Sequence, residues 1–168
     1  MKKIFCVMLM MFIVSPAFAG AIDISGRAGI YSPSVPNASP SMMYGIGADI
    51  RLVENVYARM AIETTTYSVN NVQTTMTPIT ADIIYRQTFA GMLSPYVGAG
   101  LGYYTSTTGP VTTQTTGYQA QAGVSFSLGG FSSGVEFRYM VPDSSKPDTT
   151  STSYNAYASG AFTQSIRF

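Results

Sequence analysis

The sequence predicts an all-β protein, an eight-stranded antiparallel up-and-down transmembrane β-barrel. Eight segments alternate apolar and polar residues over about the 9–11 residues that a tilted membrane-spanning strand requires. The connections between them alternate between long and short, as in barrels whose turns are short on one side of the membrane. The last segment runs to an aromatic residue, Phe168, without a polar tail. A terminal strand of this kind needs a partner, and we expect it to close the barrel against the first segment.

The amino terminus has the features of a secretory signal peptide. Lys2 and Lys3 precede an apolar run at residues 4–14 that is too short to span a bilayer as a helix. Ala17 and Ala19 occupy the small-residue positions of a cleavage site. We therefore expect residues 1–19 to be removed and residues 20–168 to form one barrel domain outside the cytoplasm. An uncleaved anchor or a buried helix is the alternative.

The composition restricts the partners of the mature chain. Without the two lysines of the signal, 7 basic and 8 acidic residues remain, a net charge of −1. This balance gives no reason to expect nucleic acid. Only 10% of the chain is charged, against roughly 25% in typical soluble domains. The one cysteine lies inside the signal, so no disulfide is expected.

The eight expected strands share a two-residue periodicity, because successive side chains of a strand point to opposite faces. They cover residues 21–31, 42–52, 56–67, 78–89, 95–105, 117–128, 132–141 and 154–168.

Four long connections are rich in Ser, Thr, Pro and Asn, and three short ones separate them. The long loops are expected at residues 32–41, 68–77, 106–116 and 142–153, and the short turns at 53–55, 90–94 and 129–131. Strict alternation places both chain termini at the short-turn end, which faces the periplasm in outer-membrane barrels. Proline cannot donate to a β-ladder, and we expect Pro78 and Pro95 to begin strands rather than interrupt them.

The charged residues of the strands all lie on the parity opposite the apolar residues, which predicts a polar network on one face. It comprises Asp23, Arg27, Asp49, Arg51, Arg59, Glu63, Asp82, Arg86, Glu136, Arg138 and Arg167. Six arginines and five acids are nearly balanced, as a buried network needs. The tight turn at residues 53–55 suggests that Asp49 lies opposite Arg59, and barrel closure suggests that Asp23 lies near Arg167.

Alternation alone does not distinguish a lipid-facing apolar surface from the core of a secreted lipocalin-like barrel or β-sandwich. Aromatic residues gather near both ends of the segments, which favours the membrane version, where two aromatic belts lie at the interfaces. Near the long loops these are Tyr31, Tyr67, Tyr103, Tyr104, Tyr118 and Tyr154; near the short turns they are Phe89, Tyr96, Phe131 and Phe168.

The stretch SPYVGAGLGY at residues 94–103 resembles a strand motif of the small outer-membrane barrels of the OmpA, OmpX and opacity-protein type. The ending with Phe162, Ile166 and Phe168 on one parity resembles the terminal signal that the barrel assembly machinery reads in that family. The resemblance covers nearly the whole chain. It implies an outer-membrane location, contact with membrane lipid and a monomer, but it does not imply an activity.

The residue types argue against catalysis. The chain contains no histidine, so a Ser/His/Asp arrangement cannot be assembled, and the usual zinc sites are excluded as well. We expect no enzyme activity and no cofactor. Gly98, Gly100 and Gly102 form an inward stripe flanked by Tyr96 and Tyr104, which we interpret as space for arginines that cross the interior, or as a ligand cavity.

The expected function is a structural or surface-interaction role in adhesion or towards a host, with a surface ligand at the long loops. The alternative is a narrow porin-like channel for small solutes, which the diameter of eight strands disfavours.

Overall fold

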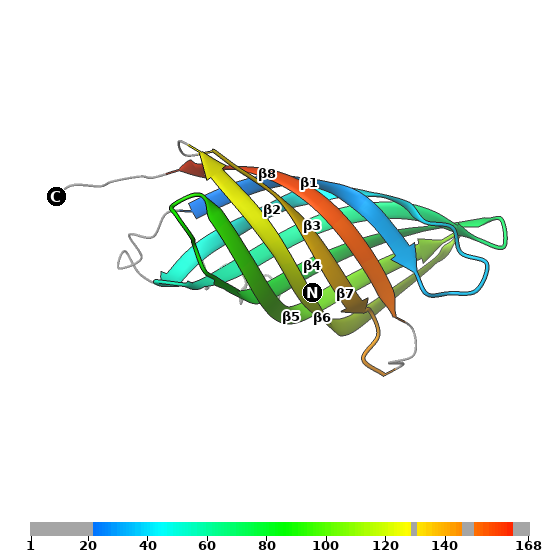
Figure 1. Ribbon diagram of the computed structural model, residues 1–168. Coiled ribbons are helices and arrows are strands. Elements are labelled where there is room, and N and C mark those ends of the chain that lie inside the picture. Colours follow the sequence, from blue (N-terminus) through cyan, green and yellow to red (C-terminus); the bar gives the residue numbers. More distant parts are fainter. Residues whose placement is uncertain (1–21, 129–130, 146–149, 163–168) are drawn as a thin grey trace.

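The computed structural model describes residues 22–128, 131–145 and 150–162, with the backbone alone for residues 153–162. Eight antiparallel strands follow one another around a closed barrel in the order of the sequence (Figure 1). The predicted fold class is confirmed. Within the described ranges, no helix combines the length and the apolar character needed to cross a membrane.

The first seven strands are longer than the segments expected from the sequence, and the eighth begins earlier than expected and is described as far as Phe162. They are β1 (Ile22–Pro33), β2 (Ser41–Val53), β3 (Val56–Val69), β4 (Val72–Arg86), β5 (Leu93–Thr108), β6 (Val111–Leu128), β7 (Phe131–Val141) and β8 (Ser151–Phe162). The last strand closes the ring on the first, with Ile22 opposite Phe162 and Pro33 opposite Ser151. The expected closing pair is therefore the observed one.

The two faces of the strands differ in the sense that a membrane barrel requires. Ile46 and Val135 expose 60% and 58% of their surface outward, whereas Arg59 and Arg138 are 2% and 0% exposed inside. A soluble barrel would place these groups the other way round, because apolar surface avoids water and buried charge is costly. The lipocalin-like alternative is therefore excluded.

Two of the four expected long loops are strands. β3 and β4 meet at a two-residue turn, Asn70 and Asn71, whose φ angles of 50° and 66° are those of a type I′ hairpin. β5 and β6 meet at Gly109 and Pro110, and Gly109 supplies the positive φ of 56°. The interpretation of residues 68–77 and 106–116 as loops was wrong. Threonine has a high strand propensity, and pairing absorbed these threonine-rich segments.

Pro78 was predicted to begin a strand, but it lies inside β4. The pairing of β3 with β4 runs from Val56 to Ile62 and resumes at Thr65, in the same register. The two unpaired positions of β3 lie opposite Thr77 and Pro78. Pairing is interrupted there because proline has no N–H to donate. The ladder tolerates the gap since strand pairing continues on both sides of it.

The predicted aromatic belts are only partly present. Tyr103, Tyr118, Phe89 and Phe131 are exposed on the outer face, but Tyr31, Tyr96 and Tyr104 are buried inside the barrel. For these three, the parity of the strand decides the side, and nearness to a strand end does not. Phe168 lies outside the described residues, and so do Ile166 and Arg167.

Candidate functional site

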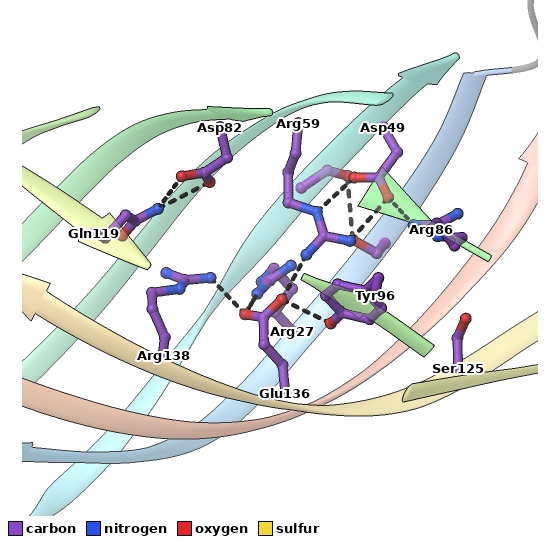
Figure 2. Close-up of polar contacts among 12 residues, drawn as sticks. Arg27, Asp49, Arg59, Asp82, Arg86, Tyr96, Gln119, Ser125, Glu136 and Arg138 are labelled. Carbon is purple, nitrogen blue, oxygen red and sulfur yellow. Dashed lines mark hydrogen bonds and ion pairs between the residues drawn. The ribbon is translucent and has the colours of Figure 1, made fainter. Parts of the chain in front are cut away.

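Glu136 is the centre of a charge cluster inside the barrel (Figure 2). Its Oε1 atom accepts hydrogen bonds from Arg27 Nη2 and, at 2.8 Å, from Arg138 Nη2. Its Oε2 atom accepts from Arg59 Nη1 and, at 2.8 Å, from the Tyr96 hydroxyl. The two oxygens of this carboxylate thus accept from three guanidinium groups and a phenol. These hydrogen bonds and opposite charges offset the cost of burying the negative charge.

Glu63 joins two of the same arginines from another side. Its Oε1 atom accepts from Arg27 Nε at 3.0 Å, and its Oε2 atom accepts from Arg138 Nη1. Both glutamates and both arginines are buried. Strands β1, β3 and β7 are therefore tied together through the interior as well as around the wall.

Asp49 and Arg59 face each other across the β2–β3 turn, the geometry expected from its length. Arg59 Nε donates to Asp49 Oδ1 at 2.6 Å and Arg59 Nη2 donates to Asp49 Oδ2 at 2.9 Å. Arg86 Nη2 also donates to Asp49, and Arg86 Nη1 lies 3.8 Å from Asp23 Oδ2. The described partner of Asp23 is thus Arg86; the expected pairing with Arg167 lies outside the described residues.

Arg51 is not part of the buried network. It is exposed at the short-turn end of β2, next to a register shift in the β2–β3 ladder. Its Nε and Nη2 atoms donate to the Tyr57 hydroxyl at 3.3 and 3.2 Å. The parity of Arg51 predicts the face of the strand on which it lies. Its side chain is exposed because it lies near the end of β2, and parity does not contain this information.

Aromatic rings line the network towards the short-turn end. Tyr57, Ile84 and Tyr96 form a buried cluster. The Arg86 guanidinium lies 4.4 Å from the centre of the Tyr57 ring, and the Arg59 guanidinium lies 5.0 Å from that of Tyr96. Rings at these distances attract cations through their quadrupole. Sequence reasoning missed this role, although Tyr96 shares its parity with the inward glycines.

A second buried cluster crosses the loop end of the barrel interior. It consists of Tyr31, Met43, Met76, Tyr104 and Met140, none more than 2% exposed. The Tyr31 hydroxyl lies 3.7 Å from the Met76 sulfur. Flexible methionines fill irregular gaps well. These side chains pack inside the barrel at its loop end, and the sequence analysis did not anticipate the cluster.

The short-turn end is more open. A cavity of about 20 Å³ lies there among polar side chains, including Asp23, Asp49, Arg59 and Arg86. This volume is enough for about one water molecule. The side chains of Asp23 and Arg86 are 28% and 13% exposed, so the network is accessible from the short-turn end, where both termini are expected to lie.

The described glycine stripe does not make room for arginines. A Cβ on Gly98 would lie 2.3 Å from Ile84 Cδ1, one on Gly100 2.2 Å from Asp82 Oδ1, and one on Gly102 2.5 Å from the Tyr104 ring. The interpretation of the stripe as space for arginines was wrong. The glycines admit side chains of β4, and of β5 itself, instead.

At the loop end of the barrel, β3 continues into β4 and β5 into β6 through two-residue turns, so that both connections are extended hairpins (Figure 1). Threonine hydroxyls pair across the strands, as for Thr66 with Thr75 at 3.0 Å and Thr74 with Thr108 at 2.8 Å. The β1–β2 loop leans on the first hairpin, where the Ser39 N–H donates to the Ser68 carbonyl at 3.1 Å. These contacts make the hairpins an ordered surface.

In the described part of the chain, no group of three or more His, Cys, Asp or Glu side chains is placed to hold a metal ion. The carboxylates of the cluster around Glu136 are neutralised by arginines that hold their acceptor atoms. The arginine donors thus occupy these carboxylate oxygens and connect distant strands through the interior.

No protein-family model matches the sequence, and neither does any curated protein sequence. Solved structures do match. Neisserial surface protein A aligns with a TM-score of 0.65 and 18% identity, over 86% of this chain and 97% of its own. Ail, the attachment invasion locus protein of Yersinia pestis, aligns with 0.62 and 13% identity, over 85% and 99%. The outer membrane enzyme PagL aligns with 0.55 and 13% identity, over 82% and 97%. The chain has the fold of the small outer-membrane barrels, as the resemblance implied.

Proposed function

We propose that this protein is a non-catalytic outer-membrane barrel that presents its two extended hairpins at the cell surface for interaction with a partner. The observation that carries the proposal is the combination of a filled interior with an ordered, exposed exterior. The charge network and the Met/Tyr cluster occupy the lumen, whereas Val72 and Val111, beside the hairpin turns, expose 50% and 61% of their surface. Binding residues are commonly carried by such projections from a rigid scaffold.

We infer the orientation from the chain that extends beyond the membrane-spanning segments. The end with the β1–β2 and β7–β8 loops and the two extended hairpins carries more of it than the other end, and in barrels of this class the larger extensions face outward. We therefore place both termini in the periplasm, the hairpins outside, and lipid around the apolar belt. The terminal residues Phe162, Ile166 and Phe168 would be read by the barrel assembly machinery, and residues 1–19 would direct export.

The hairpins suit an uncharged partner. Residues 34–40, 65–77 and 104–117 contain no charged residue, and their polar groups are mainly threonine and serine hydroxyls and amides. A structure of Ail contains the heparin analogue sucrose octasulfate, a polyanion. No lysine or arginine is present in these ranges to bind such a ligand, so we expect neutral polar chains as partners, bound through hydrogen bonds.

Absence of catalysis rests on the residues rather than the fold, since the outer membrane enzyme PagL shares that fold. This chain has no histidine, and its one cysteine is Cys6. The buried carboxylates that remain lie inside the barrel, where the polar cavity beside Asp23 and Asp49 holds about 20 Å³. General acid–base catalysis requires a group that can reach the substrate.

A narrow channel is the second candidate, and the polar cavity at the short-turn end favours it. The Met/Tyr cluster opposes it. Planar bilayer recordings of the purified protein decide between them. We expect no sustained open level, and reproducible open levels would support the channel.

Trimming the hairpins tests the surface function. In one variant residues 66–75 are replaced by Asn-Gly, which joins the paired Thr65 and Met76 directly. In another, residues 105–114 are replaced in the same way between Tyr104 and Thr115. The matched control is Asn71→Gly, which gives the full-length β3–β4 hairpin the same Asn-Gly turn.

We expect trimming to abolish attachment of proteoliposomes to surfaces coated with extracellular-matrix proteins, while the control retains it. Heat-dependent gel migration shows that each variant still forms a barrel. Equal attachment by trimmed and full-length protein, or none by either, would refute the surface role.

A further inference from the structure

A groove of about 420 Å³ lies on the outer wall of the barrel, across strands β3 to β6. The apolar side chains that line it point outward: they are Met60, Ile79, Ala81, Leu101, Tyr103 and Tyr118. Among the described residues, no charged side chain lines the groove. Its volume falls in the range of about 300–1,000 Å³ that is typical of small-molecule sites. The groove is therefore large enough for a ligand, and the ligand must be apolar where it touches the wall.

The strand register explains why the wall is hollow at this point. Met60 pairs with Ala81, Ala81 pairs with Leu101, and Leu101 pairs with Tyr118. One row of outward side chains thus crosses four adjacent strands, and Ala81 is its smallest member. Gly102, which has no side chain, also lines the groove and contributes only backbone. The larger members of the row form the walls, and Ala81 lies on the floor between them.

The β7–β8 loop borders the groove at the loop end of the barrel. Ser144 of this loop lines the groove, and its N–H donates to the Thr116 carbonyl at 3.0 Å. The Thr115 hydroxyl donates to the Pro142 carbonyl at 2.7 Å. These two bonds hold the beginning of the loop against β6, so the groove has a defined polar rim on this side.

The groove is continuous with the surface that faces membrane lipid. Ile62 and Ile83, outward neighbours of the groove on β3 and β4, are 44% and 54% exposed. Water gains few hydrogen bonds in an apolar hollow and is excluded from the hydrocarbon region of the bilayer. Hydrocarbon from the membrane is therefore the occupant that matches the walls.

The polarity of the outer face changes sharply beyond the groove. Two positions further towards the loop end, the outward residues of β4, β5 and β6 are Thr77, Thr105 and Gln114, which pair with one another in that order. The Thr64 hydroxyl lies 3.5 Å from the Thr77 hydroxyl and continues this polar row onto β3. Two residues of a strand span about 7 Å. Apolar groups thus give way to hydroxyl and amide groups within the length of one amphiphile.

The chemistry of the polar row selects a neutral head group. Hydroxyls and amides both donate and accept hydrogen bonds, as the hydroxyls of a sugar do. Phosphate groups are bound preferentially by arginine and lysine, and residues 65–77 and 104–117 contain neither. A sugar without charge therefore fits this surface better than a phospholipid head.

We propose that the groove binds one hydrocarbon chain of a neutral glycolipid, with the chain along Ala81 and Leu101 and the sugar against Thr77, Thr105 and Gln114. The groove selects the chain and the polar row selects the head. The site goes beyond the surface function, since the groove lies below both hairpin turns and faces the membrane.

The test uses n-dodecyl-β-D-maltoside, which joins a neutral disaccharide to a single hydrocarbon chain. It is titrated into bicelles of chain-deuterated phosphatidylcholine that contain the full mature barrel with ¹³C-labelled methyl groups. We expect nuclear Overhauser contacts between the maltoside chain and the methyl groups of Ala81 and Leu101, and we expect them to saturate at one maltoside per barrel. n-Dodecylphosphocholine has the same chain and a charged head, and it should bind about tenfold more weakly.

Substitutions in the groove and in the polar row separate the two parts of the site. Ala81→Ile fills the floor and should weaken maltoside binding about tenfold, while the barrel still forms because the new side chain faces lipid. The matched control is Ala122→Ile, which also points outward but lies outside the groove, and it should bind as the wild type does. Thr77→Val combined with Thr105→Val keeps the shape of both side chains, and it should reduce the preference for maltoside over phosphocholine.

Contacts that rise without saturation would overturn the proposal, because they would show ordinary exchange of membrane lipid. Equal binding of the two probes would overturn it as well. Both results come from the wild type, so they do not depend on the folding of a variant. Attachment of proteoliposomes to coated surfaces should be unchanged in Ala81→Ile, so a failure of the surface function and a failure of the lipid site are distinguishable.

Discussion

The guanidinium of Arg59 holds Asp49 with two nitrogen atoms, at 2.6 Å from Nε to Oδ1 and 2.9 Å from Nη2 to Oδ2. The two residues are paired neighbours on β2 and β3, and a third nitrogen of Arg59 reaches Glu136 on β7. One side chain thus connects a local hairpin with a strand 77 positions away. Planar, bidentate recognition of this type is specific to arginine.

Breaking this pair should be strongly destabilising. Asp49→Ala leaves Arg59 buried with part of its charge uncompensated, and we expect a loss of about 3–5 kcal/mol in the free energy of unfolding. Urea unfolding followed by circular dichroism measures it. The double variant Asp49→Leu with Arg59→Met removes both charges but also takes one partner from Arg86 and one from Glu136, so it should recover part of the loss. A double variant as unstable as the single one would contradict this.

Glu136 should matter far more than Asp23. Glu136→Gln removes the charge shared by three arginines, for which we expect a loss of about 3–5 kcal/mol. Asp23 meets its arginine at 3.8 Å in a half-open position, so Asp23→Asn should cost less than about 1 kcal/mol. Parallel urea titrations of the two variants check the order, and equal losses would refute the central position of Glu136.

Gly100→Ala should destabilise the barrel, whereas Gly26→Ala should not. The added Cβ at Gly100 would lie 2.1 Å from the Ala81 carbonyl oxygen, whereas at Gly26 it would meet nothing within 4 Å. Overpacking of this kind costs about 1–3 kcal/mol. The Gly26 variant should stay within about 0.5 kcal/mol of the wild type. Urea unfolding measures both losses, and the fraction of protein that refolds into detergent, measured by heat-dependent gel migration, is a second readout.

The Met/Tyr cluster should keep the lumen closed. Met140→Ala removes a fully buried side chain, and we expect a loss of about 2–5 kcal/mol. Combined with Met43→Ala, it should produce open levels in planar bilayers that the wild type lacks. Val135→Ala, on the lipid face, should produce none. A silent double variant would show that another element closes the barrel.

Deletion of Phe168 should impair assembly. We expect a lower yield of inserted barrel in cells, because the terminal aromatic residue is part of the proposed assembly signal. Phe131→Ala is the control, since it removes an outward aromatic residue near the same end. If the deletion left insertion unchanged, Phe168 would belong only to the aromatic belt.

The sequence contains signals for the two hairpins at residues 68–77 and 106–116, which were interpreted as loops. Asn70-Asn71 and Gly109-Pro110 are turn dipeptides. Each is flanked by threonines, which favour strands. The segments were nevertheless interpreted as loops because they are rich in polar residues, as solvent-exposed loops are. Once strands extend beyond the membrane, their composition no longer distinguishes them from loops.

The tyrosines show which sequence signal is stronger. Tyr96 and Tyr104 share their parity with the inward glycines, and both lie inside the barrel. Their nearness to strand ends predicted an interface position and was misleading. Parity is fixed by the backbone geometry of each strand, whereas a position along the strand becomes a depth only after tilt and register are set.

The sequence by itself determined the number of strands, the two faces and the residues that carry interior charge, because alternation is a local property of extended backbone. The tertiary structure decided which charges meet. Arg59 reaches Glu136, Arg86 reaches Asp49, and Asp82 is left to Gln119, because ring closure and register place side chains from distant strands at one height. Pairing across the interior depends on the whole ring, and no segment of the sequence contains that information.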